Sequence, residues 1–398
     1  MALSRGVSGV FIVAARRTPF GTYGGTLKNV TATELGLVTA KAVIQDANIS
    51  PEIISSIVYG NVIQASADAI YIARHIGLKV GVPQAVPGLV VNRLCGSGFQ
   101  AIVSGAREIM LGEADVALVG GAENMSMAPY AVRNIRFGTR LGQDIKFEDT
   151  LWEGLTDSLV KMPMGITAEN LAAKYNITRE ECENYALETQ QRWKRAHEEG
   201  RFKAEIAPVT VKGKKGPESF KVDEHPRLVS LEAMKTLPTV FKKNGTVTAA
   251  TASGVNDGAG SLIIASEEAL KKYNMKPLAR LVSYGISGCD PSIMGIGPVP
   301  ASKAALKAAG KEVKDMDIVE VNEAFAPQFL AVQRELGLDL EKTNINGSGI
   351  AIGHPLGATG ARITATLTHE LQRQQKTLAL GSACIGGGMG ISVVLERV

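Results

Sequence analysis

One pattern occurs twice in this chain, and it limits the possible folds more than any other feature of the sequence. Residues 92–98 read NRLCGSG, and they precede a helical stretch and the run ALVGG at 117–121. Residues 346–349 read NGSG, and they precede a helical stretch from His354 and the run LALG at 378–381. Two similar α/β halves packed on each other explain this repeat most simply, and chance similarity of two βαβ units is the alternative.

Strand-like and helix-like segments alternate through the first 120 residues and again from about residue 250. This alternation predicts an α/β fold with a mostly parallel sheet covered on both faces. The stretch 124–249 differs, because it holds both tryptophans and a polar helical segment, and it predicts an inserted subdomain. The expected strands are 10–15, 57–63, 88–91, 116–119, 261–265, 279–284, 318–321, 344–346, 378–382 and 391–395, and the expected helices are 33–47, 69–78, 96–111, 178–199, 301–309, 324–336 and 354–374.

The composition limits the class of protein. A chain of 398 residues buries about three quarters of its unfolded surface, so it needs neither disulfides nor a structural metal. The net charge of +4 gives no argument for a nucleic-acid partner, although it suits an anionic small molecule. Four cysteines without a C-x-x-C pair are typical of a reducing compartment. No apolar run approaches the length of a membrane span, so none is expected.

Cys95 lies between a β-branched strand and an apolar helix and is followed by Gly96, Ser97 and Gly98. At a helix N-terminus, the dipole and the free N–H groups lower the pKa of a thiol, and the same N–H groups can hold an oxyanion. The pattern therefore favours a reactive thiol. A buried structural cysteine explains this segment equally well when the segment is taken by itself.

His354 occupies the matching place in the second half, flanked by Gly353 and Pro355 at the expected start of a helix. A histidine in that setting is better explained by a site than by packing. The remaining histidines lie on helices or in polar stretches and are expected to be solvated or packed: His75, His197, His225 and His369.

Cys384 ends a strand and precedes the glycines at 386–388, in a turn that exposes N–H groups beside a thiol. One thiolate as nucleophile and a second thiol as acid and base, with a histidine between them, can support the breaking of a carbon–carbon bond. Asn322 and Glu323 follow another expected strand, and a helix N-cap is the alternative interpretation of that pair.

Three other kinds of site do not fit the sequence. It contains no G-x-S-x-G elbow, because Cys95 rather than glycine stands two places before Ser97. It contains no P-loop, and the glycines at 347–353 do not form a dinucleotide fingerprint. Cys95, His354 and Cys384 are isolated on separate loops, which is a weak metal signature, so no metal is predicted.

Taken together, these motifs resemble those of the thiolases over the whole length of the chain, and most closely those of the degradative mitochondrial type that acts in fatty-acid β-oxidation. The matching segments are RTPFG at 17–21, NRLCGSG at 92–98, GGAENMS at 120–126, NEAF at 322–325, GHPLG at 353–357 and CIGGG at 384–388. The resemblance implies the thiolase fold, with two duplicated βαβαβαββ halves packed as five layers (α-β-α-β-α) plus an inserted loop domain. The implied division is an N-terminal half at 1–123, an inserted CoA-binding loop domain at 124–249, a segment at 250–272 that completes the N-terminal half, and a C-terminal half at 273–398.

The resemblance also implies the catalytic roles. Cys95 is the nucleophile that carries the acyl group, and His354 activates it and helps to bind the thioester oxygen of the substrate. Asn322 holds a water in that same oxyanion hole. Cys384 protonates the leaving acetyl-CoA carbanion and later takes the proton of the incoming CoA. The N–H groups of Cys95 and Gly386 form the second oxyanion hole.

By the same resemblance, coenzyme A is a substrate and no cofactor is bound permanently. Arg227 would meet the adenine and 3′-phosphate end of CoA, Ser230 would lie beside it, and Ser253 would contact the pantetheine. A solvated loop charge is the alternative for Arg227. The implied reaction is the reversible cleavage of 3-ketoacyl-CoA by CoA to acetyl-CoA and an acyl-CoA two carbons shorter.

Residues 163–165 read Pro-Met-Gly where bacterial acetoacetyl-CoA thiolases carry His-Met-Gly, so a broader range of acyl lengths is expected. A condensing enzyme of the ketoacyl synthase kind would lack the thiol of Cys384, and a non-catalytic acyl-CoA or lipid carrier on the same scaffold would be expected to lose Cys95 or Cys384. The resemblance further implies a homotetramer, as a dimer of dimers, in the mitochondrial matrix. The short basic start at 1–8 would then be an uncleaved import signal.

Overall fold

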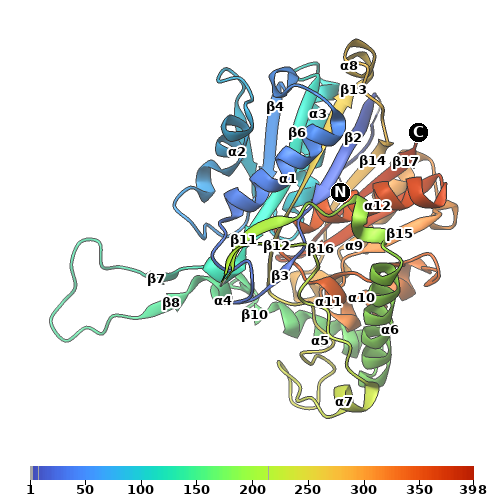
Figure 1. Ribbon diagram of the computed structural model, residues 1–398. Coiled ribbons are helices and arrows are strands. Elements are labelled where there is room, and N and C mark those ends of the chain that lie inside the picture. Colours follow the sequence, from blue (N-terminus) through green and yellow to red (C-terminus); the bar gives the residue numbers. More distant parts are fainter. Residues whose placement is uncertain (1–2, 8, 214) are drawn as a thin grey trace.

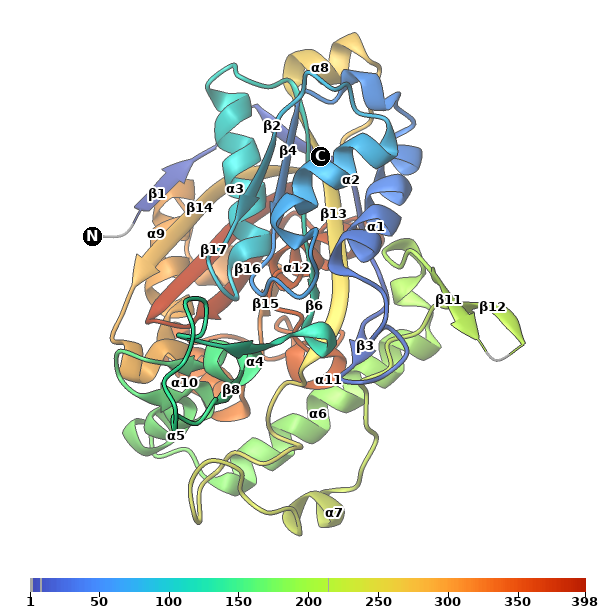
Figure 2. The same ribbon diagram turned by 90° about the vertical axis from the view of Figure 1, so that its left-hand side faces the viewer.

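The computed structural model describes residues 3–7, 9–213 and 215–398, so Met1, Ala2, Ser8 and Lys214 lie outside the description. Within the basic start at 1–8, strand β1 (Leu3–Gly6) pairs antiparallel with β14 (Ala279–Gly288), as Figure 2 shows. No helix of the described residues is long and apolar enough to cross a membrane.

The first half of the chain builds one wing of a large sheet. Its strands are β2 (Val10–Arg17), β3 (Gly21–Thr22), β4 (Ser56–Gly60), β5 (Gly88–Val91), β6 (Val116–Asn124) and β13 (Asn256–Ser266). The wing runs in the order β2-β13-β6-β4-β5, and β3 pairs with the first residues of β13. β4 is parallel to β5 and β6, whereas β13 is antiparallel to both β2 and β6.

The second half builds the other wing. Its strands are β14, β15 (Ile318–Val321), β16 (Leu378–Ile385) and β17 (Met389–Arg397), in the order β15-β16-β17-β14. The wings join where β14 pairs with β2, with Ala279 opposite Ile12, so the strands form one 11-stranded sheet. The expectation of a mostly parallel sheet is wrong. β17 follows β16 through a tight turn and β13 returns from the insertion, and each enters its wing between two antiparallel neighbours.

Helices cover both faces of each wing and give the five layers that the resemblance implies. α1 (Ala32–Ala47) and α2 (Ile72–Val80) cover the outer face of the first wing (Figure 1), and α9 (Pro298–Ala309) and α10 (Ala326–Leu336) pack on the outer face of the second. α3 (Ser97–Met110) and α12 (Thr359–Gln374) lie between the wings and contact each other and both wings.

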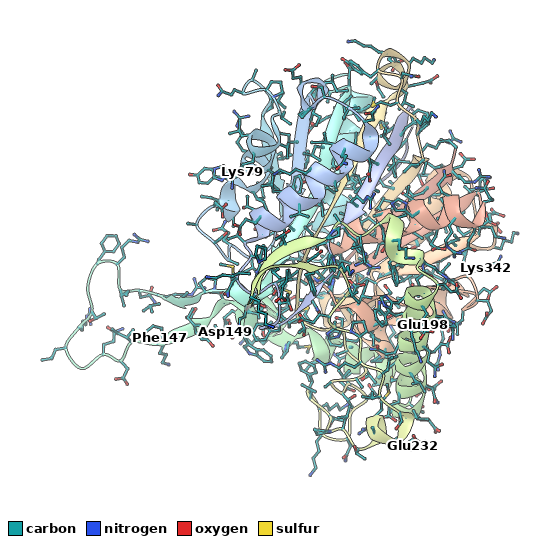
Figure 3. The ribbon with its side chains drawn as sticks, viewed as in Figure 1. Lys79, Phe147, Asp149, Glu198, Glu232 and Lys342 are labelled. Atoms are coloured by element: carbon teal, nitrogen blue, oxygen red, sulfur yellow. The ribbon has the colours of Figure 1, made fainter. Side chains whose placement is uncertain are left out.

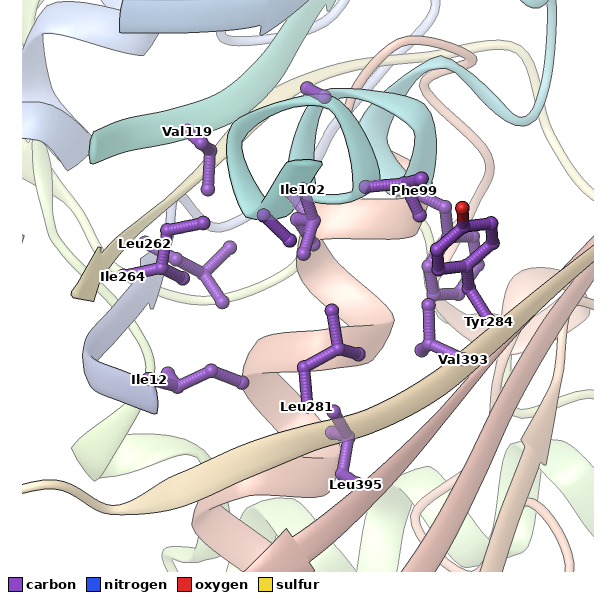
Figure 4. Packing of buried hydrophobic residues seen from close by; sticks show 14 of the residues in the cluster. Ile12, Phe99, Ile102, Val119, Leu262, Ile264, Leu281, Tyr284, Val393 and Leu395 are labelled. Atoms are coloured by element: carbon purple, nitrogen blue, oxygen red, sulfur yellow. The ribbon is translucent and has the colours of Figure 1, made fainter. Parts of the chain in front are cut away.

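Neighbouring residues of the strands contribute to different layers. Val119 and Leu262 face the central layer, as Figure 4 shows, whereas Leu118 and Ile263 pack under the outer helices of the first wing. Both faces of the sheet are therefore buried, which explains why these strands are continuous apolar runs rather than alternating ones.

The segment between β6 and β13 leaves the sheet and returns to it. Figure 1 shows the β7–β8 hairpin extending away from the body, and Figure 3 shows the exposed side chains on it, Phe147 among them. The elements of this segment are β7 (Tyr130–Val132), β8 (Phe147–Asp149), α4 (Thr150–Gly154), β9 (Thr156–Asp157), β10 (Met162–Pro163), α5 (Met164–Lys174), α6 (Arg179–Glu198), β11 (Val209–Gly213), β12 (Gly216–Phe220) and α7 (Leu231–Lys235). The remaining short helices are α8 (Glu267–Lys272) and α11 (Gly349–Ile352).

Two expected elements are wrong in detail. The strand expected at 344–346 is absent. The side chain of Asn344 bonds both the backbone N (2.9 Å) and O (3.0 Å) of Val321 on β15, and only Thr343 forms an isolated backbone bridge to β15. The helix expected from His354 begins at Thr359 instead, because the loop before it turns the N–H of Gly357 toward the Glu123 carboxyl group (2.9 Å). His354 therefore lies on a loop.

Candidate active site

Cys95 lies on a tight turn between β5 and α3. Leu94 has a φ of +46°, and its N–H donates to Oδ1 of Asn92 (2.9 Å). Ser97 closes the turn by donating to the carbonyl of Leu94 (2.7 Å). Gly96 is needed here, because a Cβ at this position would overlap the side chain of Ile385 at the end of β16. The turn that carries the first thiol is thus pressed directly against the strand that carries the second.

Cys384 is fully buried on β16, just before the glycine turn into β17. Gly387 and Gly388 have φ values of +76° and +80°, which L side chains rarely adopt. The turn brings the N–H of Gly386 to the Cys95 thiol, where it acts together with the N–H of Cys95 itself. Two N–H groups from different halves therefore converge on one sulfur.

The hydrogen bonds of His354 define its tautomer. Nδ1 lies 2.6 Å from Oγ1 of Thr359, and that hydroxyl donates its only proton to the carbonyl of Pro355 (3.0 Å). Thr359 must therefore accept from Nδ1–H. The lone pair is then on Nε2, which is buried and has no hydrogen-bond partner among the described residues. Such an arrangement presents a base to whatever enters the site.

Asn322 follows β15 and is fully buried, and neither atom of its amide has a partner in the described part of the chain. It is not a helix N-cap, since α10 begins at Ala326 after Phe325. Gly349 makes room for the amide, because a Cβ there would lie 2.8 Å from Oδ1 of Asn322. Buried polar atoms without a partner are rare, so the amide of Asn322 and Nε2 of His354 are both groups suited to a ligand.

The electrostatics correct one expectation. Burial raises the pKa of the Cys95 thiol to about 11, although the N–H groups of Gly386 and Cys95 act to lower it. Burial also raises the pKa of Cys384 well above its usual range, and it lowers the pKa of His354 to about 3, with a smaller contribution from the charge of Arg362. The resting site therefore holds two neutral thiols and a neutral imidazole. The lowered thiol pKa expected from the helix N-terminus is wrong, because desolvation outweighs the N–H groups.

Cys95, His354 and Cys384 line one cavity of about 470 Å³, which Arg227 and Ser253 also line. A second cavity of about 130 Å³ shares His225, Arg227 and Ala249 with the first. Ser230 lines neither cavity, and it is instead exposed and caps α7 with a bond from the N–H of Ala233 (3.3 Å). Asn322 and Gly386 line neither cavity. The apolar lining of the larger cavity includes Met125, Leu151, Trp152, Leu155, Met164, Val240, Phe241, Met294, Phe325 and Leu356.

Three residues near the site were not singled out by the sequence. Thr359 holds His354, as described above. Glu123 joins the two halves, because its carboxyl group accepts from the N–H groups of Val62 (3.1 Å) and Gly357 (2.9 Å). His225 was expected to be solvated or packed, but it is buried and lines both cavities. Only the GHPLG and GGAENMS motifs pointed to the neighbourhood of Thr359 and Glu123, and no sequence signal pointed to His225.

The loop that carries His225 and Arg227 is fixed from the first half of the chain. The buried Asp223 accepts from the guanidinium of Arg17 (2.6 and 3.0 Å) and from the N–H of Phe20 (2.9 Å). The N–H of Arg227 donates to Oε1 of Gln190 (2.9 Å). The site thus draws on both halves and on the inserted segment.

Comparison with known proteins agrees with this geometry. The thiolase N-terminal domain matches residues 10–268, and the thiolase C-terminal domain matches residues 275–397. The chain is 62% identical over 397 residues to the mitochondrial 3-ketoacyl-CoA thiolase of Homo sapiens, and this alignment covers 100% of this chain and 99% of the relative. It is 48% identical to a beta-ketothiolase of Cupriavidus necator, and that alignment covers 98% of this chain and 99% of the relative.

Solved structures agree as well. The crystal structure of human mitochondrial 3-ketoacyl-CoA thiolase superimposes with a TM-score of 0.96 at 61% identity, covering 98% of this chain and 99% of that one. The human enzyme in complex with CoA gives the same TM-score of 0.96 over 100% of this chain and 99% of that one. With both domain models and full-length relatives in agreement, the chain belongs to the thiolase family.

Proposed function

We propose that this protein is a 3-ketoacyl-CoA thiolase of fatty-acid β-oxidation. It cleaves 3-ketoacyl-CoA with CoA to acetyl-CoA and an acyl-CoA two carbons shorter, and the reaction is reversible. The observation that carries the proposal is the meeting of two thiols and one imidazole, from different halves of the chain, in a single apolar cavity. The full-length relatives named above support the same activity.

The first half-reaction loads an acyl group onto Cys95. Nε2 of His354 takes the thiol proton, and the thiolate attacks the 3-keto carbon of the substrate. The N–H groups of Cys95 and Gly386 stabilise the resulting oxyanion, and in such a site each donor is worth about 3–4 kcal/mol. The bond between the second and third acyl carbons then breaks, and its electron pair stays on the acetyl-CoA fragment.

Cys384 protonates that carbanion, and the thiolate of Cys384 remains. The imidazolium of His354 and a water held by the amide of Asn322 stabilise the enolate oxygen of the leaving fragment. In the second half-reaction, the Cys384 thiolate takes the proton of CoA, and the CoA thiolate attacks the acyl group on Cys95. The released Cys95 thiolate recovers its proton from His354. Exchange through a covalent acyl-enzyme predicts ping-pong kinetics.

CoA is a substrate in this scheme, and no permanently bound cofactor is needed. Arg227 would meet the adenine and 3′-phosphate end of CoA, and the small apolar cavity beside Arg227 suits the adenine. Ser253 would contact the pantetheine from the wall of the large cavity. Ser230, on the exposed cap of α7, would meet only the outer end of CoA. The contacts of Arg227 and Ser230 support the inserted segment at 124–249 as the main CoA-binding unit, and Ser253 adds a contact from the loop that follows it. The N-terminal half would then be 1–123 completed by 250–272, and the C-terminal half 273–398.

The direct test is CoA-dependent cleavage of 3-ketoacyl-CoA substrates with four to about sixteen carbons. Turnover across medium lengths, lost in both Cys95→Ala and Cys384→Ala, is expected. Turnover of the four-carbon substrate alone would contradict the broad specificity predicted from Pro163. Tight CoA binding without turnover at any length would instead support the second candidate, a non-catalytic acyl-CoA carrier.

A homotetramer, as a dimer of dimers, completes the proposal. Among the strands that the structure describes, β5 is an edge of the sheet with no partner on its outer side, and it exposes Leu89. The β7–β8 hairpin exposes Phe137 and Leu141 completely. Exposed apolar residues on an edge strand and on a projecting hairpin are typical of subunit contacts. Phe137→Asp with Leu141→Asp is expected to lower the mass measured by light scattering from four chains to two. An unchanged mass would contradict this role of the hairpin.

The proposed location is the mitochondrial matrix, with an uncleaved signal in residues 1–8. The mitochondrial relatives support the organelle. A fluorescent fusion to the C-terminus, together with N-terminal sequencing of the imported protein, tests both parts. A shortened N-terminus would contradict retention of the signal.

A further inference from the structure

His225 stands at the junction of the two cavities. Its side chain lines both the cavity of about 470 Å³ that holds the thiols and the cavity of about 130 Å³ beside Arg227. The side chain is only 5% exposed, and its Nδ1 is buried without a hydrogen-bond partner in the described residues. None of the catalytic steps derived above uses this imidazole.

The position of His225 is built rather than incidental. Two residues before it, Asp223 is held by Arg17 (2.6 Å), and two residues after it, the N–H of Arg227 is held by Gln190 (2.9 Å). Gly254 leaves the space that the ring fills, because a Cβ on Gly254 would overlap Cε1 of His225 and lie 2.6 Å from its Nδ1.

The substrate must pass this junction. In the proposed function, on which this inference rests, the thioester lies at Cys95 and the nucleotide end of CoA lies at Arg227. The part of CoA between those ends is the pantetheine arm, which carries two amide groups. An apolar passage with one unpartnered polar ring is suited to bind an amide, since a buried amide without a partner is costly.

We propose that the imidazole of His225 hydrogen-bonds an amide of the pantetheine arm and selects thiols that carry this amide. Burial, followed by the positive charge of Arg227, lowers the pKa of His225 to about 4. The ring is therefore neutral near pH 7, with one nitrogen that donates and one that accepts. Either the N–H or the carbonyl of an amide can be its partner.

The test compares three acceptor thiols: CoA, pantetheine, which has both amides but no nucleotide, and butanethiol, which has no amide. With a 3-ketoacyl-CoA as donor, the first half-reaction releases acetyl-CoA and no free CoA. The value of kcat/KM for each added thiol then reports the second half-reaction alone. His225→Phe is expected to lower kcat/KM roughly three- to tenfold for CoA and pantetheine, the size of one lost hydrogen bond, and to leave butanethiol unchanged.

Two variants sharpen the comparison. His225→Gln keeps a donor and an acceptor, and we expect it to retain most of the discrimination between pantetheine and butanethiol. His197→Phe makes the same exchange on the exposed last turn of α6, and it controls for the loss of a histidine. If His225→Phe does not fold, His225→Leu, which also lacks both ring nitrogens, gives the same readout.

Equal losses of His225→Phe for all three thiols would overturn the proposal, because they would mean that the ring only shapes the cavity. No loss for any thiol would overturn it as well. If the wild-type protein does not turn over at all, the proposed function has failed, and calorimetric binding of CoA and pantetheine to the wild type and to His225→Phe decides the role of His225. Weaker binding by the variant supports the inference, and equal binding refutes it.

Discussion

Thr359 determines which nitrogen of His354 carries the lone pair, and its removal is the most informative test of the proposed base. Thr359→Val keeps the shape of the side chain but removes the hydroxyl that accepts from Nδ1–H at 2.6 Å. A neutral hydrogen bond of this kind contributes about 1 kcal/mol, whereas a bond to the charged imidazolium contributes about 1.5–3 kcal/mol. Only the difference, about 0.5–2 kcal/mol, bears on the acylation rate.

That difference corresponds to a roughly twofold to thirtyfold slower acylation of Cys95 in Thr359→Val. The assay is a single turnover without CoA, in which rapid quenching follows the burst of acetyl-CoA that accompanies acylation. Thr359→Ser keeps the hydroxyl and is the matched control, so it is expected to acylate within about threefold of the wild-type rate. Equal rates for Thr359→Val and the wild type, or equal defects in Thr359→Val and Thr359→Ser, would refute the reasoning from the tautomer.

Three further predictions concern the buried groups around the site. Gly349→Ala places a methyl group 2.8 Å from Oδ1 of Asn322. We expect kcat to fall at least about tenfold, whereas CoA binding measured by calorimetry is retained. An unchanged kcat would exclude a role for the Asn322 amide. Burial raises the pKa of Cys95 to about 11. The rate at which iodoacetamide alkylates Cys95 is therefore expected to rise about tenfold per pH unit up to about pH 10. A plateau of this rate near about pH 8 would contradict a neutral resting thiol. Burial raises the pKa of Glu123 from 4.5 to about 7, so the folded chain binds this proton more tightly than the unfolded chain does, and the contribution of Glu123 to stability is lost as pH rises through about 7. The free energy of unfolding of the wild type and of Glu123→Gln can be measured by urea unfolding at several pH values. Between about pH 4.5 and about pH 8, the wild-type value is expected to fall by about 3 kcal/mol relative to that of the variant. Parallel curves of unfolding free energy against pH would contradict this expectation.

The glycine-rich turns pointed to residues that the structure brings together. Cys95 and His354 stand beside such turns at matching places of the two repeated halves, Cys384 precedes the glycines at 386–388, and all three line one cavity. Local patterns also predicted most helices and strands, because both faces of the sheet are buried and its strands are therefore continuous apolar runs.

Properties that depend on distant partners were not predictable. The pKa of Cys95 depends on burial that the second half provides, beginning with Ile385 against the Cys95 turn. His225 has charged neighbours in sequence, which suggest an exposed loop. However, Asp223 pairs with Arg17, some two hundred residues earlier, and His225 is buried. The antiparallel placement of β13 and β17 depends on where each strand re-enters the sheet, and alternation along the chain does not encode this.

The strand order has a consequence for the order in which the protein matures during synthesis. β17 is synthesised after the other described strands, yet it lies between β14 and β16 and, among those strands, is the only neighbour that joins β15 and β16 to the rest of the sheet. Cys384 on β16 therefore cannot be fixed opposite Cys95 until β17 has been inserted. A ribosome-bound or truncated chain that lacks β17 is thus expected to contain Cys95 but no fixed Cys384, and to show no thiolase activity until β17 is in place.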